Sequence, residues 1–388
     1  MNILFTLKSF AVGGVEKVTL QLANKFKEEG HHVLVFALCS PTLGDSGHHV
    51  LQGIDIYIGN GVKMSKYNID TYSSIVASFS PDVIINQWGQ NFYPLRSIRK
   101  VVRRDNVKII TVLHCSPKMN GRLYTLIRSL SGSCKLLNRM VIKGKLFLTH
   151  LASKICLAYN YVYSDYFVLL SESFIDDFKE YVYLMNYRKL KVIHNPITTY
   201  EQTSSDSLEK DNLALFVGRI DENKSVSRII EVWNKLKSCN SEWTLRIIGD
   251  GAELQNVKRK VSTYSLCNVE FLGFQDPLAS YERAKILFLT SDFEGVPLVV
   301  MEAMNNSCVP IVYGSFSSIY DVIDDGTDGF IIKPIHGTFS AEQMALKTKA
   351  LLMDEHKLQH MSNFAYSKSL VYSMSNIYGE WLNLFENK

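Results

Sequence analysis

Apolar strands alternate with amphipathic helices along almost the whole chain. Residues 2–7 are predicted to form a buried strand, a helix follows, and a second strand covers residues 32–38. Two strands joined by a helix form a βαβ unit, which requires a parallel sheet with both faces covered. The same rhythm predicts further strands at residues 54–58, 82–86, 107–113, 166–170, 190–194, 213–217, 245–254 (with its turn), 269–274, 286–289 and 309–313. The chain is therefore predicted to belong to the α/β class.

The length and one polar stretch indicate two domains. A chain of 388 residues exceeds what one ordinary hydrophobic core contains. The strand–helix alternation stops after Pro196, in the polar sequence TTYEQTSSDSLEKDN, and then restarts. We predict a first domain, a linker, a second domain and a final helical segment at residues 1–196, 197–211, 212–365 and 366–388, respectively.

Composition indicates a globular protein of a reducing compartment. Hydrophobic residues make up 46% of the chain and charged residues 21%. The seven cysteines are scattered, which favours free thiols over disulfides or structural zinc. The first residues have no basic region before an apolar run, and no stretch of 18 apolar residues follows. We therefore expect a cytoplasmic location.

Two acids flank a strand-to-helix turn in the second half of the chain. Glu294 lies in the turn after the strand at 286–289, and Pro297 is predicted to open the helix that carries Glu302. The amides at a helix start and the positive end of the helix dipole together form an anion site. A carboxylate accepts hydrogen bonds from two sugar hydroxyls at once. This turn is predicted to bind a nucleotide sugar.

These residues carry a resemblance to a known family. Glu294 and Glu302, within FEGVPLVVMEAM, resemble the double-glutamate motif of the retaining glycosyltransferases of family 4. VGRIDENK, which contains Arg219 and Lys224, resembles the second signature of the family, in which these two cations hold the donor diphosphate. LRIIGDGAEL resembles the strand and Gly-Asp-Gly turn of the same family. The resemblance implies the GT-B fold, two Rossmann-like domains facing a central cleft.

The first half matches the family in a glycine loop and a histidine. Gly13 and Gly14 lie where the first strand meets the first helix, and Glu16 follows them, as in the loop that contacts donor phosphate or acceptor in the family. A simple glycine turn is the alternative. His114 follows the strand at 107–113, at the edge where open α/β sheets bind ligands. The resemblance implies that this histidine orients the donor sugar.

The resemblance also implies a role for each site residue. Glu302 is expected to bind ribose hydroxyls, and Glu294 the hydroxyls of the transferred sugar. Fixed cations stabilise a departing diphosphate without a metal, so no metal or other cofactor is expected. The expected catalytic residues are His114, Glu294, Arg219 and Lys224. The expected donor-binding residues are Gly13, Gly14, Gly218, Arg219, Lys224, Gly249, Gly251, Glu294, Gly295, Val296, Pro297, Leu298 and Glu302, and the expected acceptor-binding residue is Glu16.

Positive charge is concentrated in residues 96–154. No aspartate or glutamate occurs between Asn106 and Ser164, although the net charge of the chain is only +4. Interleaved apolar residues indicate amphipathic helices suited to an anionic membrane surface. Nucleic acid is disfavoured because no nucleic-acid-binding motif accompanies the charges, and a solvated basic face is the remaining alternative. The cations are Arg96, Arg99, Lys100, Arg103, Arg104, Lys108, Lys118, Arg122, Arg128, Lys135, Arg139, Lys143, Lys145 and Lys154.

Together these features predict a retaining hexosyltransferase peripheral to the inner face of the cytoplasmic membrane. Its donor is expected to be a nucleotide sugar, with UDP favoured by family frequency, and its acceptor a glycan or glycolipid of cell-surface polysaccharide or lipopolysaccharide synthesis. A nucleotide-sugar epimerase of GT-B fold and a non-catalytic nucleotide-sugar binding protein are the alternatives. A nicotinamide dehydrogenase is disfavoured because the G-x-G-x-x-G fingerprint is missing.

Overall fold

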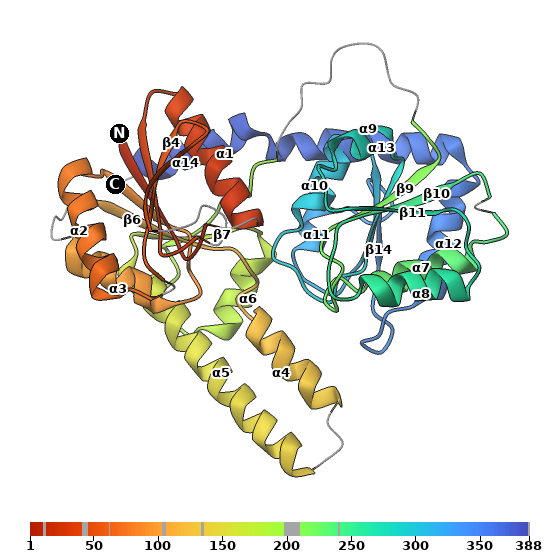
Figure 1. Ribbon diagram of the computed structural model, residues 1–388, viewed down its shortest axis with the longest axis horizontal. Coiled ribbons are helices and arrows are strands. Elements are labelled where there is room, and N and C mark those ends of the chain that lie inside the picture. Colours follow the sequence, from red (N-terminus) through yellow and green to blue (C-terminus); the bar gives the residue numbers. More distant parts are fainter. Residues whose placement is uncertain are drawn as a thin grey trace. The chain divides into compact units, whose positions relative to one another are not determined.

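The computed structural model describes residues 1–10, 13–40, 46–61, 63–102, 106–132, 136–197, 210–239 and 241–386 (Figure 1). The chain forms two compact units. The first comprises Met1–Pro196 together with Met374–Lys388, and the second comprises Ile197–Ser373. Most of the predicted linker at 197–211 lies outside the described residues.

The first unit is built on an eight-stranded sheet with the order β3-β4-β2-β1-β5-β6-β7-β8. Its strands are β1 (Asn2–Leu7), β2 (His32–Ala37), β3 (Gly47–Leu51), β4 (Ile54–Ile58), β5 (Val83–Asn86), β6 (Lys108–Leu113), β7 (Tyr166–Leu169) and β8 (Leu190–Val192). All neighbours run parallel except β3, which is antiparallel to β4. The predicted strands of this half are confirmed, but β3 was not predicted. Its sequence, GHHVL, has no fully buried residue and therefore no apolar alternation to signal a strand.

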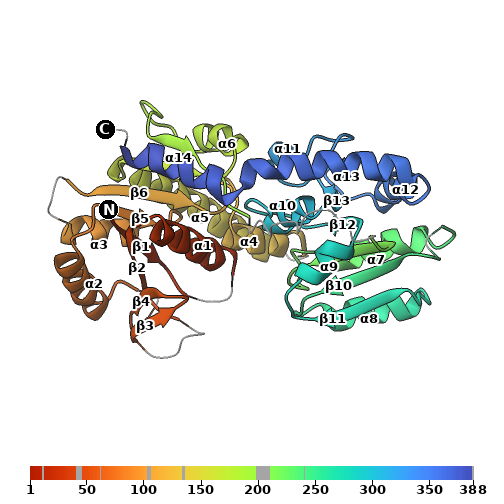
Figure 2. The same cartoon turned by 90° about the horizontal axis from the view of Figure 1, so that it is seen from above.

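Seven helices of the first unit are described: α1 (Gly14–Glu28), α2 (Lys66–Phe79), α3 (Phe92–Val101), α4 (Gly121–Gly132), α5 (Leu136–Tyr163), α6 (Ser173–Tyr181) and α14 (Met374–Glu386). The apolar positions of α1 are buried as its periodicity predicts. The C-terminal helix α14 packs beside α1 (Figure 2), where the rings of Phe26 and Phe385 lie 5.5 Å apart. Lys108 of β6 also donates to the Phe385 carbonyl at 2.6 Å.

The change of unit near the C-terminus occurs later than the predicted residue 366. Helix α13 (Glu355–Ser369) still belongs to the second unit, and the first unit resumes at Met374. The reason is that α13 buries Leu358 and Met361 in the core of the second unit. Apolar periodicity predicts helices here but does not reveal which core each helix joins.

The second unit has a six-stranded parallel sheet with the order β11-β10-β9-β12-β13-β14. Its strands are β9 (Leu213–Val217), β10 (Thr244–Ile248), β11 (Val269–Gly273), β12 (Ile286–Leu289), β13 (Val309–Tyr313) and β14 (Phe330–Ile332). Its helices are α7 (Val226–Lys235), α8 (Leu254–Thr263), α9 (Leu278–Arg283), α10 (Leu298–Asn305), α11 (Ile319–Val322), α12 (Ala341–Leu352) and α13, with a 3₁₀ turn at Leu370–Tyr372. Trp233 of α7 is fully buried in this core.

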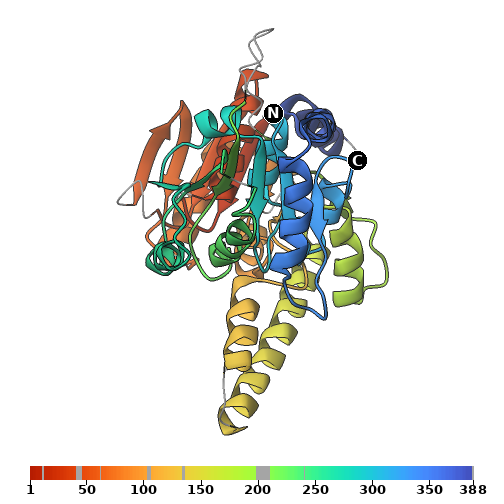
Figure 3. The same ribbon diagram turned by 90° about the vertical axis from the view of Figure 1, so that its right-hand side faces the viewer.

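Helices α4 and α5 run side by side and extend away from the sheet of the first unit (Figures 1 and 3). Only the inner end of α5 is anchored in the unit, through buried residues that include Leu157 and Asn160. Over the described ranges, no helix has both the length and the apolar character needed to cross a lipid bilayer.

Candidate active site

The turn between β12 and α10 carries the two predicted acids. Strand β12 is fully buried, so it delivers the turn to the carboxyl edge of the sheet. Helix α10 begins at Leu298 with Pro297 as its N-cap, one residue later than predicted. The first-turn amides of a helix have no intrahelical acceptor, which is the property on which the predicted anion site rests. Ser318 holds the turn by donating its hydroxyl to the Gly295 carbonyl.

Glu294 forms a close ion pair with Lys224. Lys224 Nζ lies 2.5 Å from Glu294 Oε1, although the two residues are 70 positions apart in the chain. Both side chains are only 15% exposed. The loop after β9 and the loop after β12 therefore bring an acid and a cation of the two predicted motifs into direct contact.

A side chain that was not predicted holds these two loops together. The Asn223 side chain donates to the Phe293 carbonyl at 3.1 Å and accepts from the Phe293 amide at 3.2 Å. The Thr290 hydroxyl adds a bond to the Lys224 carbonyl at 3.1 Å. Asn223 stands inside the predicted VGRIDENK motif, but nothing in a single sequence shows that its amide bonds to a distant loop.

Arg219 and Glu302 have other partners. The Arg219 side chain is 80% exposed, and its Nη2 lies 3.3 Å from Asp221 Oδ2. Asp221 also accepts the Lys224 amide at 3.0 Å, so this acid connects the two predicted cations. Tyr281 donates its hydroxyl to Glu302 at 3.3 Å. Asp221 and Tyr281 were both missed by the sequence analysis, because such contacts depend on loop conformation.

Gly249 and Gly251 are explained by packing between loops. A Cβ on Gly249 would lie 1.9 Å from the Gly218 carbonyl oxygen, and one on Gly251 would lie 2.4 Å from the Ile220 carbonyl oxygen. Their φ values of 138° and 156° also disfavour other residues. The space next to these glycines is thus filled by the loop that carries Arg219, and this packing alone requires glycine at both positions.

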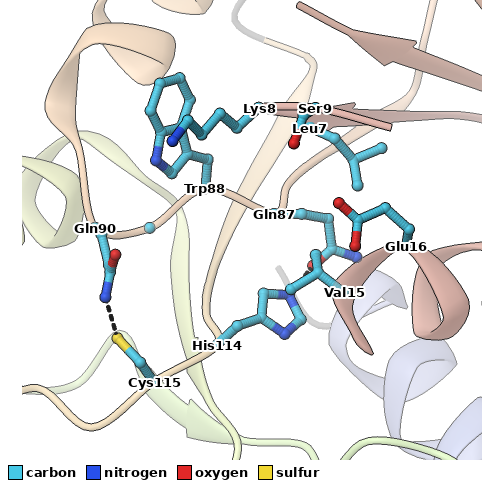
Figure 4. A pocket seen from close by; sticks show the side chains of 11 residues that line it. Leu7, Lys8, Ser9, Val15, Glu16, Gln87, Trp88, Gln90, His114 and Cys115 are labelled. Carbon is cyan, nitrogen blue, oxygen red and sulfur yellow. Dashed lines mark hydrogen bonds between the residues drawn. The ribbon is translucent and has the colours of Figure 1, made fainter. Parts of the chain in front are cut away.

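The first unit contains a pocket of about 300 Å³ (Figure 4). Two predicted residues, Glu16 and His114, lie together in its wall. The lining residues are Leu7, Lys8, Ser9, Val15, Glu16, Gln87, Trp88, Gly89, Gln90, His114 and Cys115. The pocket lies at the carboxyl ends of β1, β5 and β6, the edge at which open α/β sheets bind ligands.

His114 is held in the neutral form. Burial lowers the pKa of His114 to about 4, so the imidazole carries no charge near neutral pH. Nε2 lies 2.5 Å from Gln87 Oε1 and, with the amide in this orientation, donates to it. The other ring nitrogen, Nδ1, is then the acceptor.

Gly13 and Glu16 are coupled at the start of α1. Gly13 is the N-cap of α1, and a Cβ there would lie 2.6 Å from Glu16 Oε2. Glu16 occupies the third helical position, from which a glutamate side chain reaches back over the N-cap. Gly14 is the first residue of the helix. Glu16 therefore both lines the pocket and folds over Gly13.

Five of the predicted side chains fall into two groups, one in each unit. Glu16 and His114 lie in the pocket of the first unit. Lys224 and Glu294 form the ion pair of the second unit, with Arg219 linked to them through Asp221. Throughout the described ranges, no three His, Cys, Asp or Glu side chains are grouped so that they could hold a metal ion.

Comparisons with known proteins agree with this architecture. Residues 12–201 match the family described as Glycosyltransferase Family 4, and residues 199–368 match Glycosyl transferases group 1. The chain is 26% identical to a Campylobacter jejuni protein named GalNAc-alpha-(1->4)-GalNAc-alpha-(1->3)-diNAcBac-PP-undecaprenol alpha-1,4-N-acetyl-D-galactosaminyltransferase, over 99% of this chain and 98% of that protein. It is also 26% identical to a lipopolysaccharide 1,6-galactosyltransferase of Salmonella typhimurium, over 44% of this chain and 49% of that protein.

Solved structures share the fold. Anabaena HepE in complex with UDP superposes with a TM-score of 0.75 at 15% identity, over 99% of each chain. The lipopolysaccharide outer core galactosyltransferase WaaB in its apo form superposes with a TM-score of 0.67 at 17% identity, over 99% of this chain and 98% of that chain. At such identities the likeness shows a common fold, and the predicted pair of parallel α/β units is confirmed.

Proposed function

The chain belongs to the glycosyltransferases of family 4, and on this premise we propose that it transfers a hexose from a UDP-sugar to a glycan or lipid-linked saccharide, with retention of anomeric configuration. The Campylobacter relative is named for an undecaprenol-linked saccharide and the Salmonella relative for lipopolysaccharide, which supports that setting. In the proposed reaction the bond from the sugar C1 to the phosphate oxygen breaks, and a bond from C1 to the acceptor oxygen forms on the same face. The departing phosphate oxygen takes the acceptor proton.

The observation that carries the proposal is the Lys224–Glu294 pair. Lys224 Nζ and Glu294 Oε1 lie 2.5 Å apart, and each side chain is only 15% exposed to solvent. In such surroundings a fixed ammonium stabilises the charge that develops on a leaving diphosphate more strongly than it does in water. Glu294 holds the ammonium and accepts hydrogen bonds from hydroxyls of the transferred sugar.

The other groups of the second unit complete the donor site. The backbone amides of Gly295 and Val296, in the turn before α10, and of Leu298 and Val299, at its start, add donors for the diphosphate. Arg219 gives up its contact with Asp221 and binds a phosphate instead. The loss costs little free energy, because the two groups are 3.3 Å apart and the Arg219 side chain is exposed to water. Glu302 binds the ribose hydroxyls, with its orientation supported by Tyr281. With these positive groups in place, we propose that no metal takes part.

In the first unit, His114 and Glu16 face the reacting sugars. Because the pKa of His114 is lowered to about 4, the ring is neutral. Its Nδ1 accepts a hydrogen bond from a sugar hydroxyl, and the ring places no charge beside the developing cation at C1. Glu16 contacts the acceptor from the same pocket.

The proposal is tested by binding and by product analysis. A thermal-shift panel of UDP-, GDP- and ADP-sugars should give the largest stabilisation with UDP-sugars, since a ligand that binds only the folded protein raises its melting temperature. Incubation with donor and a glycolipid extract should give a product of unchanged anomeric configuration, in EDTA as well as in its absence. An altered donor formed without acceptor would indicate the epimerase, and binding without any transfer or donor hydrolysis would indicate a non-catalytic protein.

We further propose that an anionic membrane is the partner of the basic region. Lys118 is neutralised there, since Asp177 lies 2.9 Å from its Nζ and Glu180 also pairs with it. Arg99 pairs with Asp165 at 3.4 Å. Arg103, Arg104 and Lys135 lie outside the described residues. These contacts direct the proposal to α5, where Lys143 and Lys145 form no ion pair with any described residue.

Helix α5 has the form of an interfacial helix. Seven apolar side chains lie along one face of the helix and form a stripe, with exposed fractions of 46 to 73%. The stripe consists of Leu137, Met140, Val141, Phe147, Leu148, Leu151 and Ile155. Lys143 and Lys145 lie on the two sides of the stripe and are exposed. Apolar contact with acyl chains and attraction of lysines to lipid phosphates together favour the inner face of the cytoplasmic membrane.

A further inference from the structure

We propose that Trp88 and Lys8 form a subsite for one sugar ring of the acceptor, an inference that rests on the proposed transferase function. Both residues line the pocket of the first unit, and neither has a role in the donor chemistry described above. Lys8 Nζ lies 5.6 Å from the centroid of the Trp88 ring, so the ammonium is held by the indole (Figure 4).

The loop that carries Trp88 is fixed in place before any ligand binds. The Gly89 amide donates to the Val112 carbonyl at 3.0 Å, and the buried Asn160 of α5 donates to the Gly89 and Asn91 carbonyls at 2.6 and 3.1 Å. A Cβ on Gly89 would lie 2.5 Å from the Val112 carbonyl oxygen, so the loop packs too closely against β6 for a larger residue at this position. A rigid loop places its aromatic ring without an ordering penalty on binding.

Only part of the Trp88 ring packs against the hydrophobic core. One part of Trp88 packs against the apolar cluster that includes Leu95 and Ile98. The side chain remains half-buried and contributes to the pocket wall. An aromatic plane of this kind suits the C–H face of a pyranose, through apolar contact and weak C–H contacts to the ring.

The polar groups around the ring match the hydroxyls of a neutral sugar. Within the described part of the chain the Lys8 ammonium has no hydrogen bond or ion pair, so it is available as a donor. Glu16 supplies carboxylate acceptors, and Gln90 is exposed at the rim. The charges of Lys8 and Glu16 balance, which gives the pocket no net preference for an anionic ring. A volume of about 300 Å³ lies at the lower end of ligand pockets and suits one ring.

The direct test is a fluorescence titration with methyl α-glycosides of glucose, galactose, N-acetylglucosamine and N-acetylgalactosamine. At least one should change the tryptophan emission of the wild-type protein. Trp88→Phe should abolish this signal yet bind the same glycoside within about 3-fold when measured by calorimetry, because a flat ring remains. Trp88→Ala should weaken binding by about 10-fold, and Lys8→Met should also weaken it.

Tyr183→Ala is the matched control, since Tyr183 is an aromatic residue of the same unit that is 84% exposed and does not line the pocket. It should leave the titration unchanged. Nucleotide-sugar thermal shifts should be the same in all four variants, which separates loss of the subsite from misfolding. If UDP-sugars stabilise the protein but no glycoside produces a response, or if Trp88→Ala binds like the wild type, the subsite is refuted while the transferase assignment stands. If no nucleotide sugar binds at all, the proposed function itself fails.

Discussion

Replacing Lys224 by methionine tests the mechanism most directly. Methionine keeps much of the length of the side chain and removes the charge that lies 2.5 Å from Glu294. Loss of one fixed electrostatic contact in a water-poor site removes about 3 kcal/mol of transition-state stabilisation, or roughly 100-fold in kcat. The donor KM should change much less, because the contact strengthens as the diphosphate leaves.

The same substitution also affects stability, and this contribution can be separated. It leaves the Glu294 carboxylate, 15% exposed, without its cation, which costs about 1–3 kcal/mol. Glu294→Gln in the Lys224→Met background removes that unpaired charge, so the double variant should recover most of the lost melting temperature. It should not recover kcat.

The double-mutant cycle compares the wild type, both single variants and the double variant. Each is measured by steady-state kinetics with radiolabelled donor and by thermal melts. Activity of Lys224→Met within a few-fold of the wild type would refute the reasoning. So would a double variant that regains activity together with stability, since the pair would then be purely structural.

Three further predictions concern other parts of the molecule. Lys143→Gln with Lys145→Gln should weaken binding to anionic vesicles by about 30-fold, at about 1 kcal/mol per lysine, and binding of the wild type should fall steeply with salt; salt-insensitive sedimentation would contradict this. Gly249→Ala should lower stability by more than about 1–3 kcal/mol, because a strained φ of 138° adds to a clash 1.9 Å from a carbonyl oxygen, and a melt within one degree of the wild type would count against it. Burial lowers the pKa of His114 from 6.5 to about 4. The contribution of this residue to folding stability is therefore full above pH 6.5 and is lost as the pH falls toward 4. His114→Asn should therefore flatten the loss of stability between these pH values, by at most about 3 kcal/mol, and unchanged pH-dependent melts would disprove it.

Much of the fold was predictable because buried parallel strands are short apolar runs separated by helices. The exceptions have physical causes. Strand β3 pairs without burying a side chain, and the switch from α13 to α14 depends on which core each helix meets. Neither property leaves a mark in local periodicity.

Within the candidate site, the contact between two motif residues was predictable, but the contacts that join the loops were not. Lys224 and Glu294 were expected to act together and are in contact. Asn223, which joins their loops, and Tyr281, which donates to Glu302, were not expected. A hydrogen bond between residues 21 or 70 positions apart depends on the exact path of the segments that carry them, and single-sequence reasoning does not supply that path.

The interlocked backbones at Gly218 and Gly249 have a consequence for variation among related enzymes. The carbonyl of Gly218 fills the place that a side chain at Gly249 would need, so main-chain atoms alone set the distance between the two loops. This close approach of the two backbones does not depend on the side chains that flank the glycines. A variant of either loop would therefore have to keep glycine at position 249, whatever else is exchanged.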